Sequence, residues 1–320
     1  AVLIEGIIFI LLTITNVREK IIDCIPPVLK HAVTAGIGLF IAFIGLANAG
    51  IVVNGATILQ LGNLTDPLVL LTLFGLILAG ILLAKNVKGA FLLAMVVVSA
   101  IGMVAGLVQI PNAIVSAVPS IKPIFMQALS VPMDQIFSFD MVVVVFTFLF
   151  VDLFDTVGCL VGVASKGDML DENGKLPKAK QALFADAIGT TIGALIGTST
   201  VTAYVESASG IGEGGRTGLT SITTGVMFLL ALFFAPIFTS IPTQATAPVL
   251  ILVGVMMASS LTKIDFNDFT NAIPAFLTFA MMPLAYSIAD GIIFGIISFT
   301  VLKLATNKKS EVNLSLILLS

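Results

Sequence analysis

The sequence has little charge, little cysteine and almost no histidine, and these shortages exclude several classes of protein. Charged residues make up 10% of its 320 residues, against about 25% in an ordinary soluble domain. A soluble fold of this length would lack the polar surface it needs. Cys24 and Cys159 stand far apart in apolar surroundings, which fits neither a disulfide framework nor a metal site. The net charge of −3 gives no reason to expect a nucleic-acid partner.

Long apolar runs take the place of charge. Hydrophobic residues form 58% of the chain, and their runs have the length of about 17 to 25 residues with which a helix crosses a bilayer. The sequence therefore predicts an all-α integral membrane protein with eleven spans. They lie near 1–16, 32–50, 67–84, 89–109, 138–164, 180–197, 198–212, 217–237, 246–262, 269–286 and 287–304.

The basic residues test this set of spans. If the first span runs from outside to inside, every basic residue except Lys122 falls in a cytoplasmic loop or tail. Cytoplasmic loops of membrane proteins carry such an excess of Lys and Arg. The distribution predicts a multi-pass protein of the plasma membrane with a cytoplasmic C-terminus. The chain opens inside an apolar run without a basic region or Met, so we expect no signal peptide and expect the true start to lie upstream.

An internal repeat indicates how the spans are organised. The run GIIFILL at 6–12, leading to IPPVL at 25–29, has an echo in GVMFLL at 225–230, leading to IP at 241–242 and PVL at 248–250. The copies lie roughly 220 residues and seven spans apart, and an odd number of spans gives them opposite orientation, as in inverted-repeat transporters. This predicts the remainder of a first repeat at 1–137, a second repeat at 138–306 and a tail at 307–320. By this reasoning about three spans would precede Ala1.

Several carboxylates lie within the predicted spans, where each ionised side chain is costly. Asp152 and Asp155 are one helical turn apart and share a helix face. For Glu5, Asp152 and Asp186 the sequence leaves open whether the side chain functions or only holds helices together through hydrogen bonds. Two more have simpler explanations, since Asp140 lies at a solvated interface and Asp290 could cap a helix.

The segment 198–212 differs from an ordinary membrane helix. It is too short to cross as a helix, opens with β-branched residues and continues with small ones and glycines. About five extended and ten helical residues would span roughly 30 Å, and extended backbone is tolerated in a membrane only inside protein or beside a cavity. The half-helix would aim free N–H groups and its positive end at that cavity, with Glu206 in its first turn. A planar, uncharged ligand with hydrogen-bond donors and acceptors would suit such a site.

Four motifs in this part of the chain resemble the nucleobase–cation symporter-2 superfamily, and within it the azaguanine-type branch. They are FVDLFDTVG at 150–158, ADAIGT at 185–190, GTSTVTAYVES at 197–207 and GGRTGLT at 214–220. The resemblance extends over nearly the whole chain to about Lys303. It implies a secondary active transporter that imports hypoxanthine, adenine and guanine by proton symport.

The resemblance also implies a fold and a set of site residues. The fold has fourteen spans in two inverted repeats of seven, with a core and a gate domain, and this chain would begin at span four. The span containing Glu206 would be half strand and half helix. The resemblance assigns substrate binding to Asp155, Thr202, Tyr204, Val205 and Glu206, and a possible homodimer to the gate domain.

Two further expectations follow from the resemblance and from the chemistry of carboxyl groups. Asp155 and Glu206 are the candidates for proton coupling, because a desolvated carboxyl can take up a proton near neutral pH and a protonated one can donate to the base. Cys159, one turn past Asp155, is Thr in many relatives of that branch, a change that would alter affinity or selectivity.

Other functions remain to be weighed. A uracil, xanthine or ascorbate permease, or an anion transporter of the same fold, is the main alternative, although an anion site would favour a basic residue where Glu206 stands. A membrane enzyme is disfavoured, because no Gly-x-Gly-Asp motif occurs and the single histidine, His31, lies at a predicted interface. The sequence predicts no cofactor and no metal site.

Overall fold

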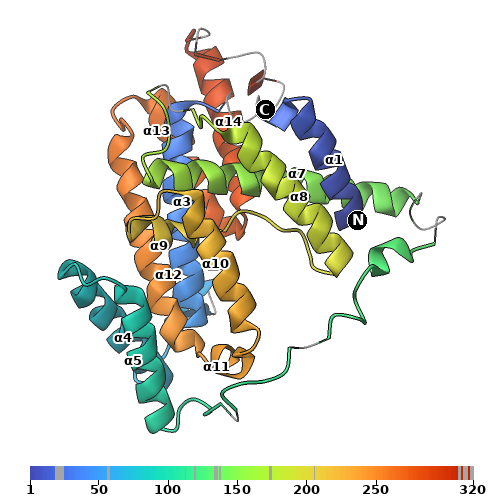
Figure 1. Cartoon of the computed structure of the whole chain (residues 1–320). Coiled ribbons are helices and arrows are strands. Elements are labelled where there is room, and N and C mark those ends of the chain that lie inside the picture. The colour runs from blue at the N-terminus through green and yellow to red at the C-terminus, as the bar shows by residue number, and fades with distance from the viewer. Residues whose placement is uncertain are drawn as a thin grey trace. The chain divides into compact units, whose positions relative to one another are not determined.

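The computed structural model is mostly helical (Figure 1). It describes residues 1–320 except 19–24, 56–57, 112, 119, 133–135, 137, 173–174, 205, 309–310, 313–315 and 318–320. The described residues form two compact units, each assembled from separate stretches of the chain.

The first unit comprises residues 1–37, 120–205 and 259–320. In it α1 packs against α8 and α7, and α14 packs against α13 and α7 (Figure 1). Its elements are α1 (Val2–Ile14), the first part of α3 (Pro27–Asn48), η1 (Gln127–Leu129), α7 (Phe139–Lys166), α8 (Ala179–Ile196), η2 (Ser259–Lys263), α13 (Phe269–Ala285) and α14 (Ile288–Ala305).

The second unit comprises residues 38–119 and 206–258. In it α12 packs against α4 and α5, which also pack against each other. Besides the rest of α3, its elements are β1 (Val52–Asn54), β2 (Leu59–Leu61), α4 (Pro67–Ala84), α5 (Ala90–Val104), α9 (Ser207–Gly212), α10 (Gly218–Ala231), α11 (Ala235–Thr239) and α12 (Thr243–Ala258).

Polar residues at the loop–helix junctions fix where several helices begin. The Asp66 carboxylate accepts the Leu68 N–H at 2.8 Å ahead of α4, and Ser138 caps α7 in the same way. Side-chain caps of this kind satisfy N–H groups that the helix itself leaves unpaired. Asp290 does not cap α14, contrary to expectation. Its own N–H donates to the hydroxyl of Ser287, which is the cap.

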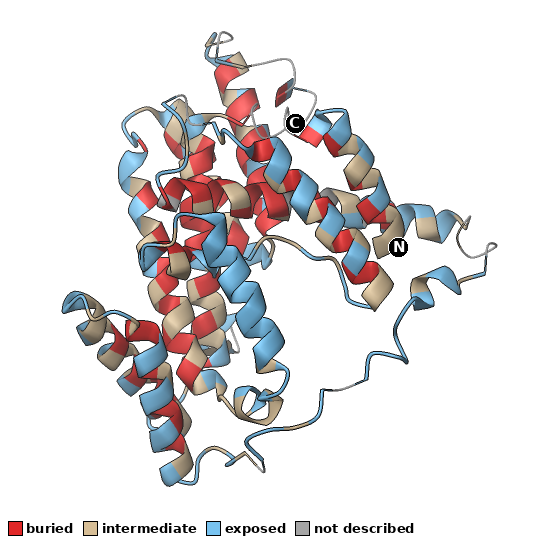
Figure 2. Cartoon of the chain, viewed as in Figure 1, coloured by how far each residue is buried: buried red, intermediate tan, exposed pale blue. Residues whose placement is uncertain are grey.

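The helices have the length and surface of membrane helices. Among the described residues, four helices are long and apolar enough to cross a bilayer, namely α3, α4, α12 extended through η2, and α14. The 18 residues of α4 span about 27 Å. No residue of α10 is buried, although Leu219, Ile222 and Phe228 lie on it (Figure 2). Exposed apolar side chains on this scale suit contact with lipid rather than water.

Each predicted span except 198–212 corresponds to helical structure, with ends shifted by a few residues. The span near 217–237 is divided into α10 and α11, and the span near 246–262 ends in η2. The sequence analysis missed the β1–β2 hairpin, in which Val52 pairs with Leu61. Two strands of three residues lie below the length at which alternating patterns are informative.

Candidate substrate and ion site

The interrupted span lies between α8 and α9. The helix α8 ends at Gly197, whose φ of 101° is accessible to glycine without strain. Thr198 to Tyr204 form no helix, and α9 then begins at Ser207. The predicted break is therefore present. The half-helix has six residues and not about ten, because glycines follow one another closely here and Gly214, at φ 103°, lies just beyond its end.

Side chains from two helices hold the non-helical segment in place. The Thr190 hydroxyl on α8 donates to the carbonyl of Val201 at 2.8 Å and accepts the Val201 N–H at 3.3 Å. The Thr200 hydroxyl donates to Glu5 Oε2 on α1 at 3.1 Å. Backbone without helical hydrogen bonds needs such partners inside a membrane. The segment is thus anchored to α8 and α1 at two successive residues.

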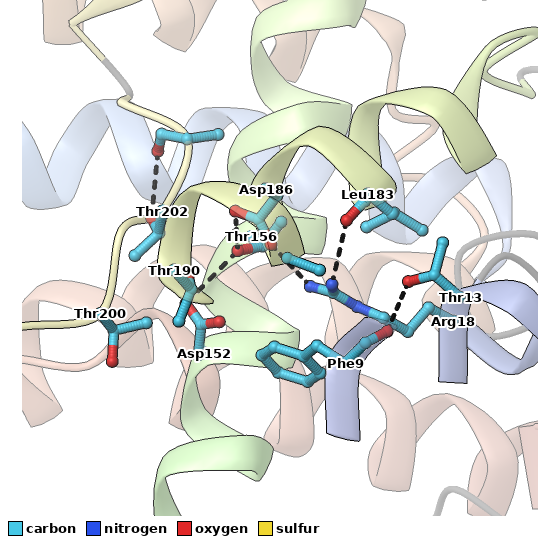
Figure 3. A network of polar contacts seen from close by, with 12 residues as sticks. Phe9, Thr13, Arg18, Asp152, Thr156, Leu183, Asp186, Thr190, Thr200 and Thr202 are labelled. Carbon is cyan, nitrogen blue, oxygen red and sulfur yellow. Dashed lines mark hydrogen bonds and ion pairs between the residues drawn. The ribbon is translucent and has the colours of Figure 1, made fainter. Parts of the chain in front are cut away.

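A buried ion pair lies beside these anchors (Figure 3). Arg18 Nη2 donates to Asp186 Oδ2 at 2.9 Å, and Nη1 donates to the carbonyl of Leu183 at 3.3 Å. The guanidinium also lies 3.9 Å from the centre of the Phe9 ring. Arg18 is 0% exposed. Its backbone follows the end of α1, as the predicted loop requires, but its side chain is buried in the protein and not solvated.

The ion pair continues into α7 through Thr156. Its hydroxyl lies 3.3 Å from Asp186 Oδ1 and 3.4 Å from Asp152 Oδ1, so it can donate to either carboxylate. Figure 3 shows these side chains converging from α7, α8 and the residues that follow α1. We call Glu5, Arg18, Asp152 and Asp186 the four-charge cluster.

Three carboxylates of this unit have an oxygen without a partner among the described atoms. They are Oε1 of Glu5, Oδ2 of Asp152 and Oδ1 of Asp155, and all three atoms are buried. Asp155 lies one turn beyond Asp152 on α7 and is in electrostatic range of Asp290 on α14. Buried polar atoms are nearly always hydrogen-bonded, so these oxygens are candidates to bind a proton, a water molecule or a ligand.

The structure locates the predicted site residues in different parts of the chain. Thr202 and Tyr204 lie in the non-helical segment, where the Thr202 hydroxyl donates to the carbonyl of Ala203 and Tyr204 is 71% exposed. Asp155 is half-buried on α7 of the same unit. Glu206 directly precedes α9 in the second unit and is exposed. Val205 lies outside the described residues.

The sequence analysis did not find Arg18 as a partner of Asp186. It counted Arg18 with the cytoplasmic basic residues, because its position past an apolar run is typical of a loop. A signal was present, since Asp186 lies within a span and an intramembrane carboxylate requires a partner. The 168 residues between the two concealed which cation it is.

Comparison with known proteins identifies the kind of protein that carries this arrangement. Residues 1–294 match the pattern of a permease family. The chain belongs to that permease family. Its members are transporters, so the permease is a membrane transporter and not an enzyme, in agreement with its composition and helices.

Individual relatives are similar over nearly all of the permease sequence. A putative permease of Methanocaldococcus jannaschii is 48% identical over 98% of this chain and 71% of its own length. The guanine/hypoxanthine permease PbuG of Bacillus subtilis is 47% identical with the same coverage. The adenine permease AdeP of Escherichia coli is 43% identical over 95% of this chain and 68% of its own length.

Proposed function

We propose that the permease imports purine nucleobases, namely hypoxanthine, adenine and guanine, by proton symport. The observation that carries the proposal is the 47% identity to a guanine/hypoxanthine permease over 98% of the chain. The interrupted span supports it, because free backbone groups beside hydroxyls and carboxylates suit a planar ligand that both donates and accepts hydrogen bonds.

The proposed binding residues are Asp155, Thr202, Tyr204, Val205 and Glu206. Each of the two carboxylates can accept N–H groups of the base when ionised, and can also donate to a ring nitrogen or carbonyl when protonated. The unpartnered Oδ1 of Asp155 supports its assignment. Thr202 and Tyr204 lie in the non-helical segment between α8 and Glu206, where a base could contact them.

Proton coupling follows from the same chemistry. In this mechanism Asp155 or Glu206 takes up a proton from outside, the neutral carboxyl then donates to the base, and both ligands are released inside. Binding of proton and base are then linked, and such linkage is reciprocal. The core domain would move against the gate domain to alternate access.

The finer architecture belongs to this proposal as well. It has seven plus seven spans in inverted repeats, with a repeat boundary near residue 138 and the segments of this chain corresponding to spans four to fourteen. The C-terminus would face the cytoplasm of the plasma membrane, and the gate domain would form a homodimer. The distribution of basic residues supports the orientation.

The proposal is tested by measuring uptake of labelled hypoxanthine at external pH of about 5.5 and 7.5. These values lie about one unit either side of the ordinary pKa of histidine. The full-length permease should show acid-stimulated uptake, and Glu206→Gln should abolish it. Glu213→Gln is the matched control, because it is the same substitution at the other end of α9. There the Glu213 carboxylate accepts the Gly89 N–H.

Competition with unlabelled adenine, guanine, uracil, xanthine and ascorbate then separates the substrate classes. Inhibition by uracil or xanthine but not by adenine or guanine would replace purine import with the alternative substrate class. Uptake that is lost equally in Glu206→Gln and Glu213→Gln would remove the special role of Glu206.

A further inference from the structure

The four-charge cluster has more negative charge than its single cation can neutralise. Arg18 pairs with Asp186, which leaves Glu5 and Asp152 without a cation partner among the described residues. Glu5 is 0% exposed and Asp152 is 5% exposed. Two ionised carboxylates without counter-charge are costly to bury, so at least one of them is expected to be neutral.

The hydrogen bonds of the cluster agree with a bound proton. Glu5 accepts one hydrogen bond, from Thr200, and Asp152 can accept one from Thr156. The other oxygen of each carboxylate is buried and has no partner among the described atoms. The Arg18 Nε–H is likewise buried without an acceptor among them. Each of the two carboxylates thus has a buried oxygen that can bind a proton.

We propose that Glu5, together with Asp152, holds a second coupling proton of the permease, in addition to the one that Asp155 or Glu206 takes up. The proposal rests on the proposed function and adds a proton-binding site to it. Protonation converts one carboxylate into a neutral carboxyl without any further reactant. The proton comes from water on one side of the membrane and returns to water on the other.

The hydrogen bond from Thr200 connects this proton to the binding segment. A hydroxyl bonds more strongly to a carboxylate than to a neutral carboxyl. Ionised Glu5 therefore holds Thr200 firmly, and protonated Glu5 holds it less firmly. Thr200 is followed directly by Val201, which Thr190 binds, and then by the proposed substrate residues. Glu5 is thus a positioning residue, whose protonation changes the anchoring of the segment that contacts the base.

Several charged groups face Glu5. The charged groups that face it are Asp186 of α8, Asp152 of α7 and Arg18, which follows the end of α1. In the part of the chain that the structure describes, no group of three or more His, Cys, Asp or Glu side chains could hold a metal ion.

The experiment uses full-length permease in proteoliposomes with labelled hypoxanthine. One assay measures accumulation driven by an imposed pH gradient, and the other measures counterflow exchange at equal pH, which needs no net proton movement. We expect Glu5→Gln, which mimics the protonated state, to lose at least about tenfold in gradient-driven accumulation and to keep counterflow. Glu172→Gln, the same change at an exposed turn residue, should keep both activities.

Several outcomes would overturn the assignment. If Glu5→Gln accumulates hypoxanthine as the wild type does, or loses counterflow although it is folded, Glu5 does not hold a second coupling proton. Wild-type accumulation driven by a sodium gradient instead of a pH gradient would overturn the choice of ion. Wild-type counterflow without any proton-driven accumulation would overturn the proton site but leave purine transport intact. No wild-type counterflow would overturn the purine proposal and this one with it.

A second variant keeps the proposal testable if Glu5→Gln does not fold. Thr200→Val removes the hydroxyl that stabilises the ionised form of Glu5 and leaves every charge in place. We expect the half-maximal external pH of uptake to rise by about one unit. An unchanged pH profile with a folded protein would contradict the link between Glu5 and the binding segment.

Discussion

Removal of the Arg18 side chain should destabilise the permease more than any other single change in its four-charge cluster. In Arg18→Met the 2.9 Å ion pair with Asp186 is lost, together with the hydrogen bond to Leu183 and the contact with the Phe9 ring. Breaking a buried pair by removing one partner costs about 3–5 kcal/mol, because the remaining charge is left buried without compensation. We expect a loss of that size in the free energy of unfolding.

The assay follows exposure of a buried thiol during unfolding. Cys159 on α7 is 3% exposed, so a maleimide dye should react with it only when α7 leaves its neighbours. A background in which Cys24 and any cysteine outside these 320 residues are replaced by Ser makes Cys159 the single reporter. Unfolding of the detergent-solubilised permease in increasing SDS, followed by this reaction and by circular dichroism, gives the free-energy difference.

The double variant Arg18→Met/Asp186→Asn is the control. It removes the charge that the single variant leaves buried, so it should be more stable than Arg18→Met alone, with a coupling energy of about 1–3 kcal/mol. Two results would refute the reasoning that the ion pair is buried and structurally coupled. One is a free energy of unfolding of Arg18→Met within about 1 kcal/mol of the wild type. The other is a loss in the double variant that equals the sum of the losses in the two single variants.

Two further predictions concern α13 and α14. A Cβ at Gly295 would overlap the Thr278 side chain, so Gly295→Ala should lower the free energy of unfolding by about 1–3 kcal/mol in the same SDS assay. Gly225→Ala on exposed α10 should lower it much less. Equal losses would contradict close packing of α13 against α14. Outside the membrane, the Lys308 ammonium donates to Asp268 and lowers the pKa of that carboxyl. The ion pair therefore stabilises the folded state above the unfolded pKa of about 4, and this stabilisation is lost as the pH falls below that value. Asp268→Asn, which can still cap α13, should therefore melt below the wild type at pH 7 and converge with it in acid, and a pH-independent difference would contradict the pairing.

Much of the fold could be predicted, because lipid makes the sequence rules strict. Every backbone group of a span must be paired within the protein, so long apolar runs such as 67–84 can only be helices. The break after Gly197 was also predictable, since β-branched residues and glycines replace a helical pattern there. The length of α9 was not, because it depends on where Gly214 adopts its positive φ.

The sequence by itself determined that this chain is a helical membrane transporter of one family, because composition, run length and the motifs from Phe150 to Thr220 are local properties. Only the tertiary structure decided which buried charges meet. Glu5 and Arg18, on α1 and just after it, are far along the chain from Asp152 and Asp186 on α7 and α8. The pairing of Arg18 with Asp186 leaves Glu5 and Asp152 without a cation partner among the described residues. Local pattern says nothing about such partners, because the cost of an unpaired buried charge depends on everything that surrounds it in space.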